Sequence, residues 1–191
     1  MPAHNQTAPG ELEDVRRFVN SWSIPNQTRI ETDQLPQWAS DPQAWTRELS
    51  RCPLHPEDQL DTLLELRLAL RESCANHDHD SEALNTWFDK VPLSAFIESI
   101  ESVARLRLKP LQSTYRGHIL ALVANAIASG EWSRLKTCGD CQWAFYDHTR
   151  NGNKRWCGMS KGGPDGRACG TIAKVTAFRL RAADKARKAA E

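Results

Sequence analysis

The apolar residues of this chain recur mostly at the spacing of amphipathic helices. Leu63, Leu66, Leu70 and Cys74 are separated by three or four positions. At 100° per residue they share about one third of the circumference of a helix. We therefore predict a helix over residues 56–75 whose apolar stripe is buried.

Other segments have weaker helical spacing but clear boundaries. Shorter helices are predicted over residues 11–20, 42–50, 81–88 and 112–129. Asp41 and Pro42 combine an N-cap with a proline in the first turn and so mark the start of the helix over residues 42–50. Gly130 marks the end of the helix over residues 112–129. The segment 24–36 contains Pro25, Asn26 and Pro36 and is predicted to be a loop.

One segment changes from helical to alternating spacing. Residues 103–109 alternate apolar side chains with Arg105, Arg107 and Lys109. This period of two predicts a strand with one apolar and one wet face, with residues 95–100 as its hairpin partner. The predicted fold class is therefore mainly α with a small β-hairpin.

The charge of the chain changes sign near Gly130. Residues 1–130 hold 12 Lys and Arg against 18 Asp and Glu, net −6, whereas residues 131–191 hold 13 against 6, net +7. We predict a disordered lead over residues 1–10, a helical domain over 11–130 and a basic module over 131–191. A basic module indicates contact with nucleic acid or another polyanion, although it could also neutralise the acidic body.

The basic module contains four of the six cysteines. Cys138, Cys141, Cys157 and Cys169 follow the pattern C-x2-C-x15-C-x11-C. This spacing predicts one structural Zn²⁺ held by four thiolates. A disulfide or redox arrangement, unliganded cysteines, and His148 in place of one thiolate are the alternatives. With zinc and four thiolates the module still carries about +5 by charge counting.

The sequence around the cysteines predicts a small finger. Residues 142–147 and 154–158 are predicted strands joined by a turn at Asn151-Gly152, and a long helix follows from Cys169 to Ala190. The alternating aromatic residues Trp143, Phe145 and Trp156 are expected to form the core of the finger. An apolar stripe on the last helix is expected to pack on the zinc module; it comprises Ile172, Val175, Phe178 and Ala182.

Basic residues of the finger are the candidate contacts to nucleic-acid phosphates. They are Arg150, Lys154, Arg155, Lys161, Arg167, Lys174, Arg181, Lys185 and Lys188. The four on the last helix project within about 60° of one another at helical spacing. The alternative is a solvated cationic helix end that complements its own dipole.

Other polar residues give weaker indications. Asn20, Arg29 and Asp33 are candidates for a small-ligand site, or alternatively bind loop backbone and one another. His77-Asp78-His79-Asp80 is predicted to be a polar turn. No nucleophile elbow, phosphate loop or HExxH motif occurs, and a closed four-thiolate site has no position for substrate, so we expect no enzyme.

The motifs of the finger together resemble those of a known family. They are Cys138-x2-Cys141-x-Trp143-x-Phe145-x-Asp147, the turn Arg150-Asn151-Gly152, Arg155-Trp156-Cys157-x-Met159, and Cys169-Gly170 before a basic helix. In this order they resemble the CGNR zinc-finger family, described as candidate stress-induced transcription regulators of bacteria with a helical N-terminal domain. Phe18-Val19-Asn20-Ser21, Arg29, Asp33 and Leu35 are similar to the N-terminal signature of that family.

The resemblance implies a DNA-binding regulator whose zinc finger is zinc-ribbon or treble-clef-like and ends in a long basic helix. Two departures are visible. Thr171-Ile172 stands where the family has Asn-Arg, and the gap between Cys157 and Cys169 is wider than the family's. We expect the metal site to tolerate both changes, whereas the contact made by the Asn-Arg pair is missing.

The remaining expectations concern location and partners. The first residues lack an apolar signal region, and the longest apolar run, residues 119–128, is interrupted by Asn125. We therefore expect a cytoplasmic protein without a membrane segment. DNA, a small-molecule effector and a second copy of the chain are the partners considered.

Overall fold

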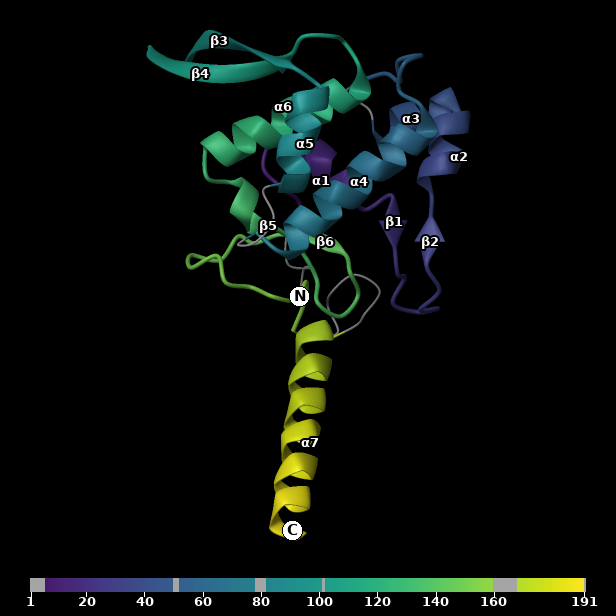
Figure 1. Cartoon of the computed structure of the whole chain (residues 1–191), viewed down its shortest axis with the longest axis vertical. Coiled ribbons are helices and arrows are strands. Elements are labelled where there is room, and N and C mark those ends of the chain that lie inside the picture. The colour runs from purple at the N-terminus through teal and green to yellow at the C-terminus, as the bar shows by residue number, and fades with distance from the viewer. Residues whose placement is uncertain (1–5, 50–51, 78–81, 101, 160–167, 191) are drawn as a thin grey trace.

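The computed structural model describes residues 6–49, 52–77, 82–100, 102–159 and 168–190. The helices are α1 (Leu12–Val19), α2 (Leu35–Ser40), α3 (Pro42–Glu48), α4 (Leu60–Ala75), α5 (Glu82–Lys90), α6 (Tyr115–Ala128), the 3-10 turn η1 (Trp132–Arg134) and α7 (Cys169–Ala190). Antiparallel two-stranded sheets pair β1 (Trp22–Ser23) with β2 (Thr32–Asp33), β3 (Leu93–Ile100) with β4 (Val103–Pro110), and β5 (Leu135–Thr137) with β6 (Ala144–Tyr146). The predicted class, mainly α with small β-hairpins, is confirmed (Figure 1).

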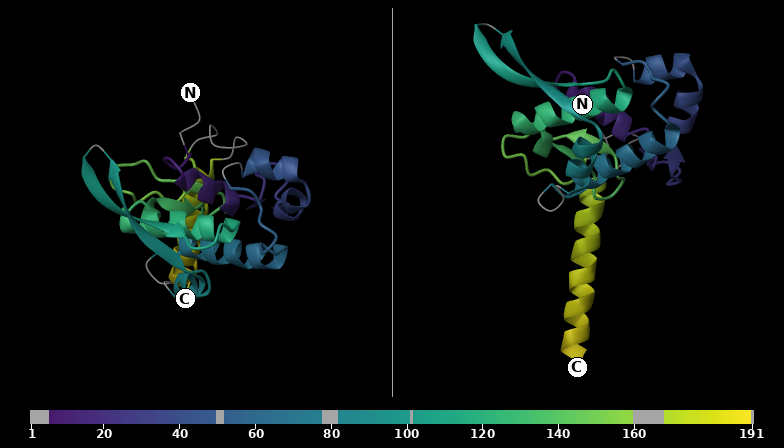
Figure 2. Two further views of the ribbon diagram at one scale, coloured as in Figure 1. Left: turned by 90° about the horizontal axis from the view of Figure 1, so that it is seen from above. Right: turned by 45° about the horizontal axis from the view of Figure 1, so that its top comes forward.

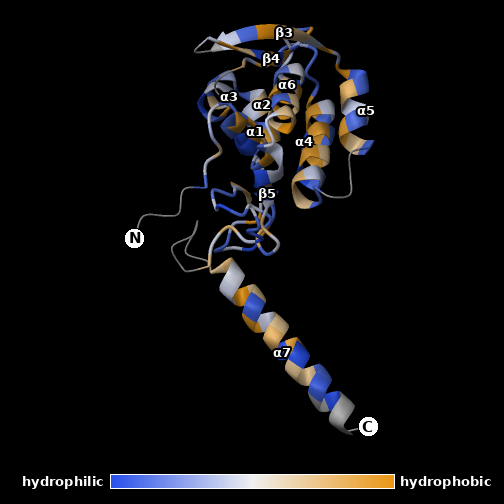
Figure 3. Cartoon of the chain, turned by 90° about the vertical axis from the view of Figure 1, so that its left-hand side faces the viewer, coloured by the Kyte–Doolittle hydropathy of each residue, from blue (hydrophilic) through white to orange (hydrophobic). Residues whose placement is uncertain are grey.

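The core lies between α1, α4 and α6. The predicted stripe of α4 is buried, and Phe18 of α1 meets Tyr115 of α6 edge-to-face with ring centroids 5.4 Å apart. Trp45 of α3 packs on the same Tyr115 ring at 4.7 Å. Figure 3 shows the apolar residues of α4 and α6 concentrated in this part of the molecule.

Helix α4 begins at Leu60, later than predicted, because the residues before it cap another helix. The buried carboxylate of Asp58 accepts hydrogen bonds from the backbone N–H groups of Tyr115 and Arg116, at 2.7 and 3.2 Å. These are first-turn donors of α6 that have no partner within the helix. A carboxylate at this position also interacts favourably with the helix dipole.

The loop predicted over residues 24–36 is shorter than expected. Its end forms β2 and the first turn of α2, where Pro36 is tolerated because first-turn N–H groups need no helical partner. The Asp41 cap is confirmed, since its side chain accepts a hydrogen bond from the N–H of Gln43 at 2.9 Å. The predicted cap of α5, at residues 80–81, lies outside the described residues.

The β3–β4 hairpin forms as predicted but extends away from the body (Figure 2). At its base, the side-chain amide of Asn125 binds both the N–H and the carbonyl of Leu108. Farther out, Ile97 and Leu106 pair across the strands and are 66% and 65% exposed. In the outer part of this hairpin the apolar face is therefore wet as well, which differs from the predicted single wet face.

The hydrophobic core continues across the boundary predicted at Gly130. Trp132, Leu135, Ala144 and Tyr146 belong to the same buried cluster as the helices of the body. The predicted disordered lead is also bound from Gln6 onward: its carbonyl accepts a hydrogen bond from Tyr146 N–H and its side chain donates one to the Cys157 carbonyl. The first part of the finger is thus anchored on the body. Helix α7 is not.

Candidate metal centre

The first two cysteines lie in the turn between β5 and β6. Lys136 pairs with Phe145 in this antiparallel sheet, and Cys138 and Cys141 follow β5 directly. The turn is closed by hydrogen bonds from Cys138 N–H to the Trp143 carbonyl and from Gln142 N–H to the Cys138 carbonyl, both 2.9 Å. The C-x2-C segment is thereby held in a tight knuckle that turns both thiols inward.

The strand pairing in the finger differs from the prediction. Strand β6 pairs with the upstream β5, whereas residues 154–158 return to the knuckle without forming a strand. The return is fixed by a hydrogen bond from Gly139 N–H to the Arg155 carbonyl. The predicted turn is present, because Gly152 has a positive φ of 58° and donates its N–H to the Thr149 carbonyl.

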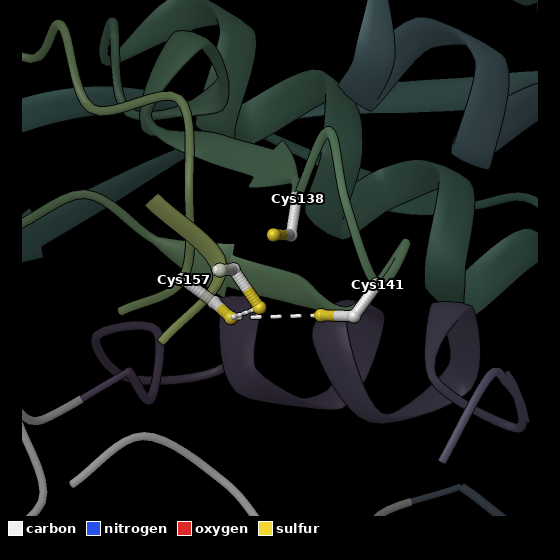
Figure 4. A group of neighbouring side chains, drawn as sticks. Cys138, Cys141 and Cys157 are labelled. Carbon is white, nitrogen blue, oxygen red and sulfur yellow. Dashed lines mark hydrogen bonds between the residues drawn. The ribbon is translucent and has the colours of Figure 1, made fainter. Parts of the chain in front are cut away.

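The four cysteine sulfurs form one buried cluster. All lie within 4.8 Å of one another, with Cys141 Sγ 3.6 Å and Cys169 Sγ 3.7 Å from Cys157 Sγ. Figure 4 shows Cys138, Cys141 and Cys157 turned toward a common centre. Four sulfurs at 2.3 Å from one tetrahedral zinc would be about 3.8 Å apart. The cluster therefore fits a zinc ion, and the distances exclude disulfides because bonded sulfurs lie about 2.05 Å apart.

The thiols also influence one another's ionisation. Hydrogen bonds from Cys141 and Cys157 lower the pKa of Cys138. The resulting thiolate in turn raises the pKa of Cys157, an effect to which burial adds. The pKa of Cys169 is raised by burial first, then by a hydrogen bond with Asp140 and by the neighbouring Cys138 and Cys141. Four thiols this close together cannot all ionise without a counter-charge, and a divalent cation would supply it.

The predicted aromatic core surrounds the cysteines. Phe145 is fully buried against them, and Trp143 and Trp156 pack at the side. His148, the alternative ligand, instead places its Nε2 2.8 Å from the Thr7 carbonyl. Cys74 lies in the core of the body and Cys52 at its edge, so neither belongs to the cluster.

Asp147 organises the loop after β6. Its buried carboxylate accepts hydrogen bonds from Thr149 N–H, Thr149 Oγ1 and Lys154 N–H at 2.9, 2.6 and 2.7 Å. Burial alone would raise the pKa of this carboxyl, but these bonds and the Lys136 ammonium at 3.7 Å outweigh it and lower the pKa. The ionised carboxylate therefore stabilises the folded loop.

Replacing Asp147 by asparagine should destabilise the finger by about 1–3 kcal/mol, because buried donors lose a charged acceptor. With a lowered folded pKa, the stabilisation is complete above the unfolded value of about 3.9 and is lost as the pH falls through the folded pKa. Thermal unfolding of the zinc-loaded protein, compared between pH 7 and pH 5.5, should give the same deficit at both values. An unchanged melting temperature at pH 7 would contradict this role.

The three candidate ligand residues connect the body with the finger or with α4. Asn20 accepts a hydrogen bond from Ala144 N–H at 2.7 Å and donates one to the Ala144 carbonyl at 2.9 Å. Arg29 donates to the carbonyl of Asp140 in the knuckle at 3.1 Å. Asp33 pairs with Arg67 through two contacts of 2.6 Å. Their predicted role in ligand binding stays a prediction.

Two arginines of α4 contribute to this connection and were not identified from the sequence. Arg67 is buried and also donates to Ser21, whereas Arg71 donates to the carbonyls of Val19, Trp22 and Gln142. Burial and the neighbouring Arg67 lower the pKa of Arg71 to about 10. The sequence signal that could have identified Arg67 and Arg71 is their spacing of four residues, which places both on one side of α4 next to its apolar stripe.

Helix α7 is anchored only at its first turn among the described contacts. Cys169 and Gly170 are buried, and the N–H of Gly170 donates to the Gly158 carbonyl at 2.9 Å. Beyond them the helix projects from the molecule (Figures 1 and 2). Val175 and Phe178 are 42% and 67% exposed. The expectation that the apolar stripe packs on the zinc module is therefore wrong.

The candidate nucleic-acid contacts fall in two places. Lys174, Arg181 and Lys185 are exposed on α7, which also contains Lys188. Arg150, Lys154 and Arg155 lie in the loop that returns to the knuckle, where Lys154 is half-buried. Lys161 and Arg167 lie outside the described residues, as do Asp78–Asp80 of the predicted polar turn.

The four buried thiols define this part of the chain as a structural zinc finger with one zinc site. Residues 134–182 match the family model of the CGNR zinc finger, the family that the motifs of this segment resemble. The match covers both strands of the finger, all four cysteines and part of α7.

No curated protein matches the chain. Within the described residues, no helix combines the length and apolar character required to span a membrane.

Proposed function

We propose that this protein is a DNA-binding regulator in which the zinc finger holds α7 out for contact with nucleic acid. The observation that carries the proposal is the exposure of α7: a helix of 22 residues with a single anchored end. Most of the stability of helices in proteins comes from packing an amphipathic face against a partner. A helix projecting in this way gains stability from a partner.

The charge of α7 selects the partner. The helix contains six Lys and Arg and one Asp, net +5. Two such helices from two copies would repel one another, whereas the phosphates of DNA would attract the helix. The major groove of DNA is wide enough to admit one α-helix. Lys174, Arg181 and Lys185 share one side of the helix, where they could reach the phosphates along one strand.

Zinc sets the direction of the helix. Cys169 is both the fourth cysteine of the cluster and the first residue of α7. Fixing its sulfur next to Cys157 therefore fixes the start of the helix relative to β5, β6 and the body. In this proposal zinc is structural, and the contact energy comes from the basic residues.

A salt titration of DNA binding tests the proposal. Fluorescence anisotropy of labelled mixed-sequence duplex DNA, with zinc-loaded protein at 50 and 200 mM salt, should show an affinity that falls by about tenfold to 100-fold, as expected for about two to four phosphate contacts. Absence of binding at 50 mM salt would refute DNA binding. Binding that is independent of salt would contradict the phosphate contacts.

A second candidate function is supported by a cleft of about 630 Å³ between α4 and the β1–β2 sheet. Its lining includes Trp22, Asp33, Arg67 and Arg71, and the Arg71 guanidinium lies 4.2 Å from the centre of the Trp22 ring. A small molecule bound there would contact the residues that join body and finger. We propose on this basis that the body could sense an effector. Homodimerisation stays a prediction.

A further inference from the structure

We propose that a second cleft, between the end of α4 and the zinc finger, is a binding site for a phosphate group. The cleft has a volume of about 480 Å³. Its functional side chains are His77 from the segment after α4, Ser133, Lys136 and Thr137 from around β5, and Lys154 and Arg155 from the loop before Cys157. This site is separate from the exposed face of α7.

The chemistry of the lining favours a multiply charged oxyanion. Two lysines and one arginine line the cleft, together with the hydroxyl-bearing residues Ser133 and Thr137. No carboxylate is among the described residues that line it. Lysine supplies a point charge and arginine supplies paired N–H donors, and phosphate accepts both. The cleft beside Trp22 differs because Asp33, Glu65 and Glu72 accompany its two arginines.

The cations of the cleft are positioned by the finger. The Lys136 ammonium contacts the Gly152 carbonyl and lies 3.7 Å from Asp147, which also accepts the N–H of Lys154. The Lys154 ammonium lies 5.4 Å from the centre of the buried Phe145 ring. Asp147 already pairs with Lys136, so Lys154 and Arg155 supply the positive charge that an anion in the cleft would meet. The contacts that hold the two lysines in place reduce the entropic cost of binding.

The position of Arg155 connects the cleft to the metal centre. Its carbonyl accepts the N–H of Gly139 in the knuckle, and its guanidinium lies 5.7 Å from the centre of the Trp156 ring. Gly139 itself lines the cleft. Because the knuckle and residues 154–157 are held together by the cysteine cluster, zinc should be required to assemble the site.

Two sources could supply the phosphate. A phosphodiester of bound DNA is one, and this form of the inference rests on the proposed function. A free phosphate or the phosphate of a small metabolite is the other and is independent of DNA binding. The volume exceeds that of inorganic phosphate, so a group attached to the phosphate would also fit.

The test uses the full-length, zinc-loaded protein and two probes. Isothermal titration with inorganic phosphate probes the free anion, and anisotropy with labelled duplex DNA probes the phosphodiester. The variant Lys154→Gln/Arg155→Gln removes two charges from the cleft. The control Lys90→Gln/Lys109→Gln removes two charges from α5 and β4, whose residues do not line it. Zinc content and melting temperature verify folding, and the single variant Lys154→Gln serves if the double variant is unstable.

We expect at least one probe to bind the cleft variant about tenfold to 100-fold more weakly than the control, because charge-assisted hydrogen bonds are lost. Weaker phosphate binding with unchanged DNA affinity would assign the site to a free phosphate. Weaker DNA binding without detectable phosphate binding would assign it to the DNA backbone. If wild-type protein binds phosphate but no DNA, the proposed function fails and the site stands. Equal binding of both probes by cleft variant and control, or no binding of either probe to wild type, would overturn the inference.

Discussion

Replacing Cys141 by serine is expected to remove most of the zinc and, with it, the order of the knuckle, of residues 154–159 and of α7. Cys141 Sγ lies 3.6 Å from Cys157 Sγ in a cluster whose members are all buried. A serine hydroxyl is a poor zinc ligand, and the three remaining sulfurs cannot complete a closed tetrahedral site. The free energy of zinc binding in small fingers, about 10–16 kcal/mol at neutral pH, is at the same time their folding free energy.

The loss should be local. Helices α1, α4 and α6 have their own core, whereas α7 is fixed only through Cys169 and its neighbours among the described residues. We therefore expect zinc, measured by elemental analysis, to fall from about one per chain to a small fraction, with a decrease in helical circular dichroism from α7. Helical signal from the body should persist.

Cys52→Ser is the matched control, because Cys52 is half-buried at the edge of the body and lies outside the cluster. It should retain zinc and helicity. A Cys141→Ser protein that still carries one zinc per chain would contradict the four-thiolate site. Zinc loss with an unchanged α7 signal would contradict the claim that the metal orders the helix.

The parts of this structure that the sequence predicts best are those encoded by local spacing. The knuckle at Cys138 and Cys141 is a four-residue unit, and the stripe of α4 repeats within one helix, so each can be read without knowing distant contacts. The Asp41-Pro42 helix start is local for the same reason. Predicting the zinc cluster also required that Cys157 and Cys169 fold back to the knuckle. This follows from the preference of structural zinc for four ligands.

The errors arise where distant segments compete. Strand β5 has only three residues and no visible alternation, so nothing in its sequence indicates that it pairs with β6 in preference to residues 154–158. The guanidinium of Arg71 donates a hydrogen bond to the carbonyl of Gln142, which lies 71 residues away in the sequence. The stripe on α7 indicates that the helix has an apolar side, but periodicity does not specify what covers that side. Here no described part of the chain does.

Neutralising one side of α7 should weaken DNA binding more than neutralising the same number of charges elsewhere. In Lys174→Gln/Arg181→Gln/Lys185→Gln, three exposed cations that share one side of the helix are lost. Glutamine keeps a strong helix former at each position, so α7 itself should be retained. At about 0.1 M salt we expect affinity for duplex DNA to fall about 10- to 100-fold, and the slope of log K against log salt to become shallower by about two to three.

The control Lys90→Gln/Arg105→Gln/Lys109→Gln has the same net charge but changes α5 and the β3–β4 hairpin. If binding depended only on the overall charge of the protein, both triple variants would lose equal affinity and the role of α7 would be refuted. A large loss confined to the α7 variant, with zinc content unchanged, would locate the phosphate contacts on this helix. Since the zinc cluster fixes the first residue of α7, adding a chelator to wild-type protein should weaken binding at least as strongly as the triple substitution.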